Sequence, residues 1–168
     1  IDGTLSIMVG GDAAVFAVIQ PLLACMGNEV THCGKVGAGQ AVKLMNNMVV
    51  AQTVVAIAEA LATVRASGAV DGKVLFETLT KGSADSFVLR NHGLQFMEPG
   101  NHPTQGAFPT NYILKDLSYA IRLAEAAGVT MAQAETTRRL LQATKAAGYG
   151  DNYYTAVIDV LEGRVKGR

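Results

Sequence analysis

Lys43, Asn46 and Asn47 place a primary amine and two amides within one helical turn, and Gln40 adds a further amide just before them. At about 100° per residue, these side chains project from one face of a helix. No acidic residue lies within four positions of Lys43. A lysine buried without a fixed carboxylate has a lowered pKa, which suits proton transfer near neutral pH. The residue types and their spacing predict acid–base chemistry at Lys43 on an amide-rich surface.

A long helix must position these side chains. Residues 38–66 contain no Pro and no Gly after Gly39, and Ala, Leu, Met, Val and Gln predominate. This composition predicts one helix to Ser67, longer than the average helix. The same face turns wholly apolar after Asn47, so we expect the helix, and Lys43 with it, to be buried. The alternative is that Lys43 only marks the solvated end of a helix.

Composition excludes several classes of protein. Of 168 residues, 49% are apolar and 17% charged, and 14 basic residues balance 14 acidic ones. With no net charge or basic cluster, nucleic acid and anionic membranes are poor partners. Cys25, Cys33 and three scattered histidines predict neither a disulfide framework nor a metal site. We expect reduced cysteines and a cytoplasmic protein, with any targeting segment upstream of Ile1.

The long helix is the candidate that most resembles a membrane span. Gln52, Thr53 and Glu59 interrupt its apolar run, so we expect no segment that is both long and apolar enough to cross a bilayer. Glycine and capping residues divide the remainder of the chain into shorter elements. The pattern predicts a strand at residues 3–11, a helix at 12–26, a strand at 28–33, and after the long helix further helices at 71–80, from 86, at 112–127 and at 131–147, with a loop at 98–110.

The series Gly37, Gly39, Lys43 and Asn47, read as G-x-G-x-x-x-K-x-x-x-N, resembles the catalytic signature of the β-hydroxyacid dehydrogenases. That family includes 3-hydroxyisobutyrate dehydrogenase, tartronate semialdehyde reductase and glyoxylate/succinic semialdehyde reductase, with 6-phosphogluconate dehydrogenase as a distant relative. The resemblance extends over nearly the whole chain. It implies a mostly α fold, in which a helical domain like the C-terminal domain of 6-phosphogluconate dehydrogenase (36–168) follows a strand–helix–strand remnant of a Rossmann domain (1–35).

The resemblance also implies roles for residues in two motifs. The segment from Phe108 to Lys115, Asp116 and Leu117 is similar to the family's F-x-x-x-x-x-x-K-D-L. Lys43 would be the general acid and base, Asn47, Phe108 and Asp116 would bind a small β-hydroxyacid, and Lys115 would lie beside the nicotinamide of NAD or NADP. The upstream domain would hold most of the cofactor, so we expect the 168-residue chain to be inactive alone.

Two further segments are similar to family motifs. Gly82 to Ser86 resembles a turn in which Ser86 caps the following helix. The segment that begins at Gly148 resembles the family's closing Gly-x-Gly-Asp-x-Asp-x-Ser-Ala-Val, but Tyr153 replaces an Asp and Thr155 a Ser. We interpret both replacements as changes in helix capping.

Two alternatives remain open. Imine reductases share this architecture but generally carry another residue in place of the catalytic lysine, so Lys43 favours hydroxyacid chemistry. Alternatively, the chain is a helical interaction module of an imine-reductase-like or non-catalytic relative. In the family the long helix packs across a subunit interface, and the high apolar content of this chain is consistent with a homodimer or homotetramer.

Overall fold

A computed structural model describes residue 3 and residues 5–165 of the chain. The chain divides into two compact units, one that ends at Asn46 and a helical unit that begins at Asn47. The first contains two strands and a helix, and helices make up the second. The mostly α fold with a preceding strand–helix–strand segment is therefore confirmed.

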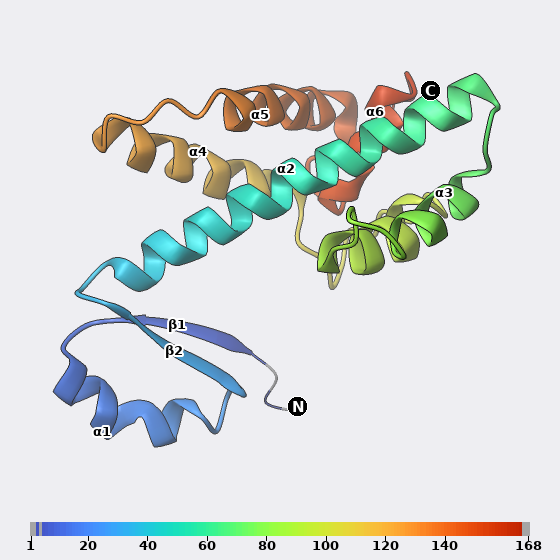
Figure 1. Cartoon of the computed structure of the whole chain (residues 1–168). Helices are drawn as coiled ribbons and strands as arrows, with labels where there is room; N and C mark the ends of the chain where they lie inside the picture. The colour runs from blue at the N-terminus through green and yellow to red at the C-terminus, as the bar shows by residue number, and fades with distance from the viewer. Residues whose placement is uncertain (1–2, 4, 166–168) are drawn as a thin grey trace. The chain divides into compact units, whose positions relative to one another are not determined.

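The N-terminal unit is a small parallel βαβ arrangement (Figure 1). Strands β1 (Ser6–Gly10) and β2 (Glu29–Gly34) pair in parallel, and α1 (Ala13–Leu23) connects them. Parallel neighbours need such a crossover because a tight hairpin can join only antiparallel strands. The carboxylate of Asp12 accepts hydrogen bonds from the backbone N–H groups of residues 14 and 15, at 2.9 and 3.0 Å, and thereby caps the N-terminus of α1.

Two glycines allow β1 to approach the start of the long helix. A Cβ atom added at Gly39 would lie 2.4 Å from the carbonyl oxygen of Met8, and one added at Gly10 would lie 2.7 Å from that of Lys35. Any side chain at either position would force the two backbones apart. Gly37 has a φ of 91°, a left-handed conformation that glycine adopts without strain. The glycine series is therefore required by the backbone itself.

The long helix α2 (Ala38–Ser67) has the predicted bounds. Inside the helical unit, Val54, Ala58 and Leu61 are fully buried. The expectation that no segment could cross a membrane is wrong by length and composition, because the few polar residues leave α2 with a mean hydropathy of 1.6 over its most apolar part. A helix in a protein core has the same composition, and 39% of this apolar part is buried inside the structure.

The helical unit packs around α2 and contains short helices as well as long ones. Gly72, at the start of α3, lies so close to α2 that an added Cβ would be 2.6 Å from Leu61 Cδ1. The core draws fully buried side chains from most helices, among them Phe76, Leu89 and Leu117. The remaining elements are α3 (Gly72–Leu79), the π-helix η1 (Leu89–Met97), α4 (Thr110–Ala126), α5 (Ala132–Thr144), the π-helical turn η2 (Lys145–Tyr149), the 3₁₀ turn η3 (Tyr154–Ala156) and α6 (Val157–Leu161).

Two helix starts inside this unit have side-chain caps, and the one at Ser86 was predicted. Asp71 accepts from the N–H of Lys73 at 2.9 Å, and the Ser86 hydroxyl accepts from the N–H of Leu89 at 3.0 Å. Helices α4 and α5 lie side by side, joined by a short turn at Gly128 (Figure 1). The segment before α4 is a loop, as expected. That loop leads directly into the first residue of α4.

Candidate active site

The start of α4 is fixed by the closing motif of the chain. The N–H of Thr110 donates to the carbonyl of Asn152 at 2.9 Å, and the N–H of Asn111 donates to that of Gly150 at 2.9 Å. These bonds satisfy donors that a helix N-terminus leaves without intrahelical partners. Because the first turn of α4 is held in place, the side chains one turn later, Lys115 and Asp116, also have a defined position.

Asn47 and Asp116 meet inside the helical unit. Asn47 Nδ2 donates a hydrogen bond of 2.7 Å to Asp116 Oδ2, from α2 to α4. Asn47 is 6% exposed, and the side chain of Asp116 is 14% exposed. A hydrogen bond to a charged acceptor at such a sheltered place is stronger than one between neutral groups. Residues that lie far apart in the sequence and were predicted to share a site are thus in direct contact.

Lys115 extends this contact towards solvent. Its Nζ lies 3.4 Å from Asp116 Oδ1 and 5.5 Å from the ring centroid of Tyr112. The lysine side chain is nevertheless 55% exposed. A carboxylate on one side and an aromatic face on the other restrict the ammonium while leaving it accessible. Lys115 can therefore meet a ligand without first losing its partners.

Phe108 belongs to an aromatic row beside this cluster. Its ring centroid lies 6.0 Å from that of Tyr112 and 6.2 Å from that of Tyr154, both in edge-to-face geometry. Tyr112 is the residue whose ring faces Lys115. The half-buried Phe108 thus forms part of a wall that leads to the amine, and its predicted contact with substrate stays a prediction.

The expected burial of Lys43 is wrong, because its side chain is exposed. The first turns of α2 belong to the N-terminal unit, where Gly39 alone among residues 38–46 is buried, and the buried side chains of the helix begin at Asn47, where the helical unit begins. The apolar composition of α2 as a whole concealed this change along its length. Lys43 still precedes Asn47 by one helical turn, so both side chains project from the same face of α2.

His92 was missed by the sequence reasoning. Its Nδ1 is hydrogen-bonded to the hydroxyl of Tyr153 and lies 3.5 Å from that of Tyr154. Burial lowers the pKa of His92 and raises the pKa values of both tyrosines. Tyr153 occupies the N-cap position of η3 and makes no side-chain cap hydrogen bond there. The interpretation of this replacement as a change in capping stays a prediction. The tyrosine pair at a position where an Asp is common was the signal.

Thr155 also contacts a histidine. Its hydroxyl lies 2.9 Å from His102 Nδ1, and the carbonyl of His102 accepts from Asn152 Nδ2 at 2.6 Å. Burial is the main cause that lowers the pKa of His102, the carboxylate of Asp159 opposes it, and Arg164 adds to the lowering. This cluster fastens the loop before α4 to the C-terminal helices. It supports the site from a distance.

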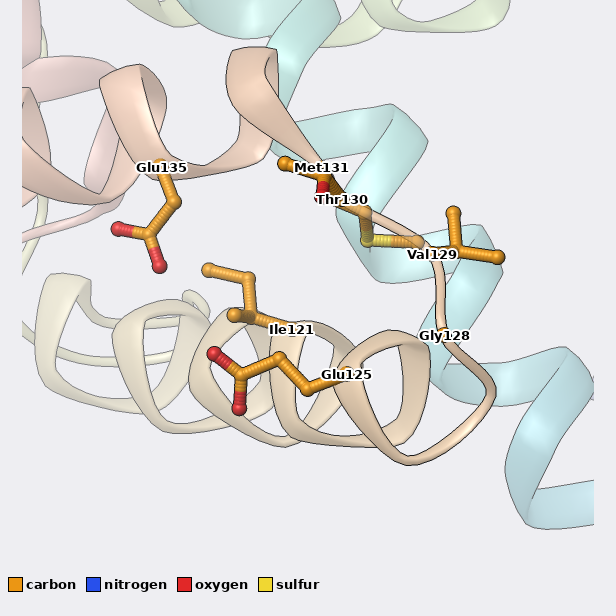
Figure 2. A pocket seen from close by; sticks show the side chains of 7 residues that line it. All are labelled: Ile121, Glu125, Gly128, Val129, Thr130, Met131 and Glu135. Carbon is orange, nitrogen blue, oxygen red and sulfur yellow. The ribbon is translucent and has the colours of Figure 1, made fainter.

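A pocket at the C-terminal end of α4 is lined by none of the predicted site residues. Its volume is about 360 Å³, and Figure 2 shows the carboxylates of Glu125 and Glu135 on either side of Ile121. Glu135 already accepts two hydrogen bonds from Arg138, at 2.9 and 2.7 Å. Among the described residues, no group of three or more His, Cys, Asp or Glu side chains is arranged to hold a metal ion.

Comparison with known families identifies the relationship. Residues 37–161 match the family model described as NAD-binding of NADP-dependent 3-hydroxyisobutyrate dehydrogenase. The chain belongs to the β-hydroxyacid dehydrogenase family. Residues 1–34 match the NAD binding domain of 6-phosphogluconate dehydrogenase. The cofactor of these families is NAD or NADP, as expected. The boundary at residues 35 and 36 stays a prediction.

Individual relatives agree with this assignment. The chain is 34% identical over 161 residues to 2-hydroxy-3-oxopropionate reductase of Escherichia coli, covering 96% of the chain and 54% of the relative. It is 29% identical to the mitochondrial 3-hydroxyisobutyrate dehydrogenase of Drosophila melanogaster, covering 95% of the chain and 50% of the relative. The chain therefore spans about half the length of the curated relatives it matches.

Solved structures show the same fold. A structure of Mycobacterium tuberculosis 3-hydroxyisobutyrate dehydrogenase with L-serine is 32% identical, with a TM-score of 0.83, covering 95% of this chain and 55% of that one. A 3-hydroxyisobutyrate dehydrogenase from Salmonella typhimurium is 25% identical, also with a TM-score of 0.83, over 94% of this chain and 54% of that one.

Proposed function

We propose that this chain is the C-terminal part of an NAD(P)-dependent oxidoreductase that interconverts a small β-hydroxyacid and its semialdehyde. The observation that carries the proposal is the hydrogen bond from Asn47 to Asp116. It brings the two motifs that resemble the family signature into one cluster, on a chain that belongs to the family. The names of the relatives support the substrate class, since they include reductases and dehydrogenases of short hydroxyacids.

Each of the predicted site residues has a distinct task in this proposal. Lys43 takes the hydroxyl proton during oxidation and returns it during reduction. Asn47, one turn later on α2, offers an amide that can both donate and accept hydrogen bonds to the substrate. Asp116 and Phe108 complete the substrate side of the site. The exposure of Lys43 is compatible with this task, because a general base must reach its substrate.

Lys115 is the residue that this chain contributes to the cofactor. Its ammonium is exposed yet restrained by Asp116 and Tyr112, which fits the binding of a nicotinamide nucleotide. When bound, the nicotinamide supplies the hydride chemistry, and the protein supplies orientation and one proton. The choice between NAD and NADP belongs to the rest of the nucleotide-binding domain. A cytoplasmic location stays a prediction, since some relatives are named as mitochondrial.

The experiment that tests this proposal compares two lengths of polypeptide. We expect the 168-residue chain to show no hydride transfer with 3-hydroxyisobutyrate or L-serine, followed by the absorbance of the reduced nicotinamide. The full-length enzyme that contains it should turn over at least one short β-hydroxyacid. Normal turnover by the 168-residue chain alone would contradict the assignment of the cofactor to another domain. A full-length enzyme inactive on short hydroxyacids in both directions would contradict the reaction.

A second candidate function is subunit association. On α1, Val15, Val18 and Leu22 form an apolar stripe and are 58, 80 and 69% exposed. Apolar stripes of this kind mark surfaces that another element covers. We expect a homo-oligomer, a dimer or a tetramer, when the chain is measured by light scattering. A strictly monomeric chain at micromolar concentration would count against this second candidate.

A further inference from the structure

The carboxylate of Asp116 has both of its oxygen atoms engaged inside the protein. Oδ2 accepts from Asn47 Nδ2 at 2.7 Å, and Oδ1 lies 3.4 Å from Lys115 Nζ. The side chain is largely withdrawn from solvent, whereas that of Lys115 is more than half exposed. A side chain that binds a substrate directly presents its polar atoms to the space that the substrate occupies. Asp116 instead turns its atoms towards two other members of the candidate site.

The negative charge of Asp116 also disfavours direct contact with the substrate. The proposed substrate carries a carboxylate, and a second carboxylate in contact with it would repel it. Beside Lys115, the charge of Asp116 is balanced within the protein. The ammonium then lies between this carboxylate and the ring of Tyr112. Asp116 is thus better suited to hold the site residues than to bind an anionic substrate.

Asn47 is the residue whose orientation this contact decides. A side-chain amide has two orientations of similar shape, one presenting N–H groups and the other an oxygen. An ionised carboxylate only accepts hydrogen bonds, so it selects the orientation in which the NH₂ group of Asn47 faces Asp116. The amide oxygen of Asn47 is then turned away from Asp116, where it can accept a hydrogen bond from a hydroxyl group. The opposite orientation would place the amide oxygen of Asn47 against a carboxylate oxygen of Asp116, and neither atom can donate a hydrogen bond.

We propose that Asp116 is a positioning residue, which fixes the amide orientation of Asn47 and the place of Lys115 and does not itself contact the substrate. This inference rests on the proposed function for its catalytic meaning, and it revises the role given there to Asp116. The underlying coupling between Asn47 and Asp116 is a property of the helical unit alone.

A kinetic double-mutant cycle in the full-length enzyme tests the positioning role. Asp116→Ala and Asn47→Ala should each lower kcat/KM by about 10²-fold, because a loosened amide no longer orients the hydroxyl. The double variant should be no worse than Asn47→Ala alone. Asp116→Asn should recover most of kcat, since its amide oxygen can still accept from Asn47. Losses that multiply in the double variant would show an independent contact between Asp116 and substrate and would overturn the inference.

A stability cycle on the 168-residue chain reads the same coupling without any activity. Asp116→Ala should lower the Tm of the parent by about 2–4 °C and should have almost no effect in a background that already carries Asn47→Ala. The matched control is Glu77→Ala, which removes an exposed carboxylate 3.9 Å from Lys73. Its small effect should be the same in both backgrounds.

The two measurements separate failure of the inference from failure of the proposed function. Additive Tm changes for Asn47 and Asp116 would overturn the inference even if the full-length enzyme is active. An inactive full-length enzyme would overturn the proposed function, and the stability cycle would still decide whether Asp116 fixes Asn47. If an alanine variant does not fold, Asp116→Leu, which has a similar shape but no acceptor, and Asn47→Ser form the cycle in its place, with the same expected non-additivity.

Discussion

The two units of this chain bury their apolar residues to very different extents. In the helical unit, α2, α3, η1, α4 and α5 each contribute fully buried side chains, such as Phe76, Leu89 and Leu141. In the N-terminal unit, α1 has no buried residue, and Val18 is 80% exposed. Both units have regular secondary structure, and each contains a helix whose N-terminus an aspartate caps, Asp12 in the first and Asp71 in the second. The difference shows that a segment can form regular secondary structure without burying its apolar side chains in a core.

The physical reason lies in the number of elements available to cover each apolar face. Two strands and one helix present an apolar surface that they cannot themselves cover, and a two-stranded sheet is marginal in water. In the helical unit, each helix has neighbours on its apolar side. The candidate catalytic residues follow this division, because Lys43 belongs to the first unit and the Asn47–Asp116 pair to the second.

The largest expected effect concerns the residue on the less buried side of this division. In the full-length enzyme proposed above, Lys43→Met should lower kcat by about 10²- to 10⁴-fold, because it removes the proposed general acid and base. The rate of hydride transfer measures it. Lys35→Met is the matched control, since it removes another exposed lysine of the same unit and should leave the rate unchanged. Equal effects of the two changes would show that Lys43 acts only through charge.

Equivalent truncations in the two units should differ sharply in cost. Phe76→Ala should lower the free energy of unfolding of the helical unit by about 3–5 kcal/mol, because it leaves a cavity in the core. In the monomeric chain, Val18→Ala should change it by less than about 0.5 kcal/mol, as is usual for exposed positions. Chemical denaturation followed by circular dichroism at low protein concentration measures both. A large loss for Val18→Ala in the monomer would contradict this contrast, whereas a loss that appears only at concentrations where the chain associates would support association through α1.

Removing a helix cap in each unit should have a smaller effect on stability than removing a core side chain, and the two units should again differ. Asp71→Ala should cost about 1 kcal/mol, because α3 is part of the cooperative core and loses its N-cap. Asp12→Ala removes an equivalent cap from α1 but should leave the main thermal transition in place. If both changes shift that transition equally, the two units unfold together and the contrast between them is wrong.

The smallest effect at neutral pH comes from the histidines of the helical unit. Burial lowers the pKa values of His92 and His102 below the usual 6.5. Below that pH, these two histidines therefore bind protons more readily in the unfolded chain than in the folded one. Their contribution to stability is fully present above about pH 6.5 and is lost as the pH falls below that value. Thermal melts between pH 7.5 and 5.5 should show a falling Tm.

The variant His92→Asn/His102→Asn provides the control for that fall. It should flatten the dependence of Tm on pH, because neither asparagine gains a proton in this range. An unchanged slope in this variant would assign the pH dependence to other groups.

Local signals in the sequence predicted most of the elements. Asp12, Asp71 and Ser86 mark helix starts because each side chain can satisfy backbone N–H groups of its own first turn. The bounds of α2 follow from a run without helix-breaking residues. The π-helical winding of η1 was not predicted, and a Cβ atom added at its Gly93 would lie 3.2 Å from both Ile57 Cδ1 and Phe76 Cε2. Such packing carries no local signature.

The site shows the same division between local and long-range information. The sequence predicted that the amine of Lys43 and the neighbouring amides share one face of α2, because residues about four positions apart lie one helical turn apart. The resemblance of the motifs added Lys115, Asp116 and Phe108. The contacts of His92 with two tyrosine hydroxyls, and of His102 with Thr155, join residues more than fifty positions apart in the chain. No spacing rule predicts a contact of that range.

By itself, the sequence determined the family, the long helix and the face on which Lys43 and Asn47 project, because periodicity and capping act over a few residues. Only the tertiary structure decided that Asp116 holds Asn47, that Lys115 stays exposed and that Lys43 is not buried. Burial and pairing depend on which distant segments cover a side chain. That information resides in the packing of whole helices and not in any single stretch.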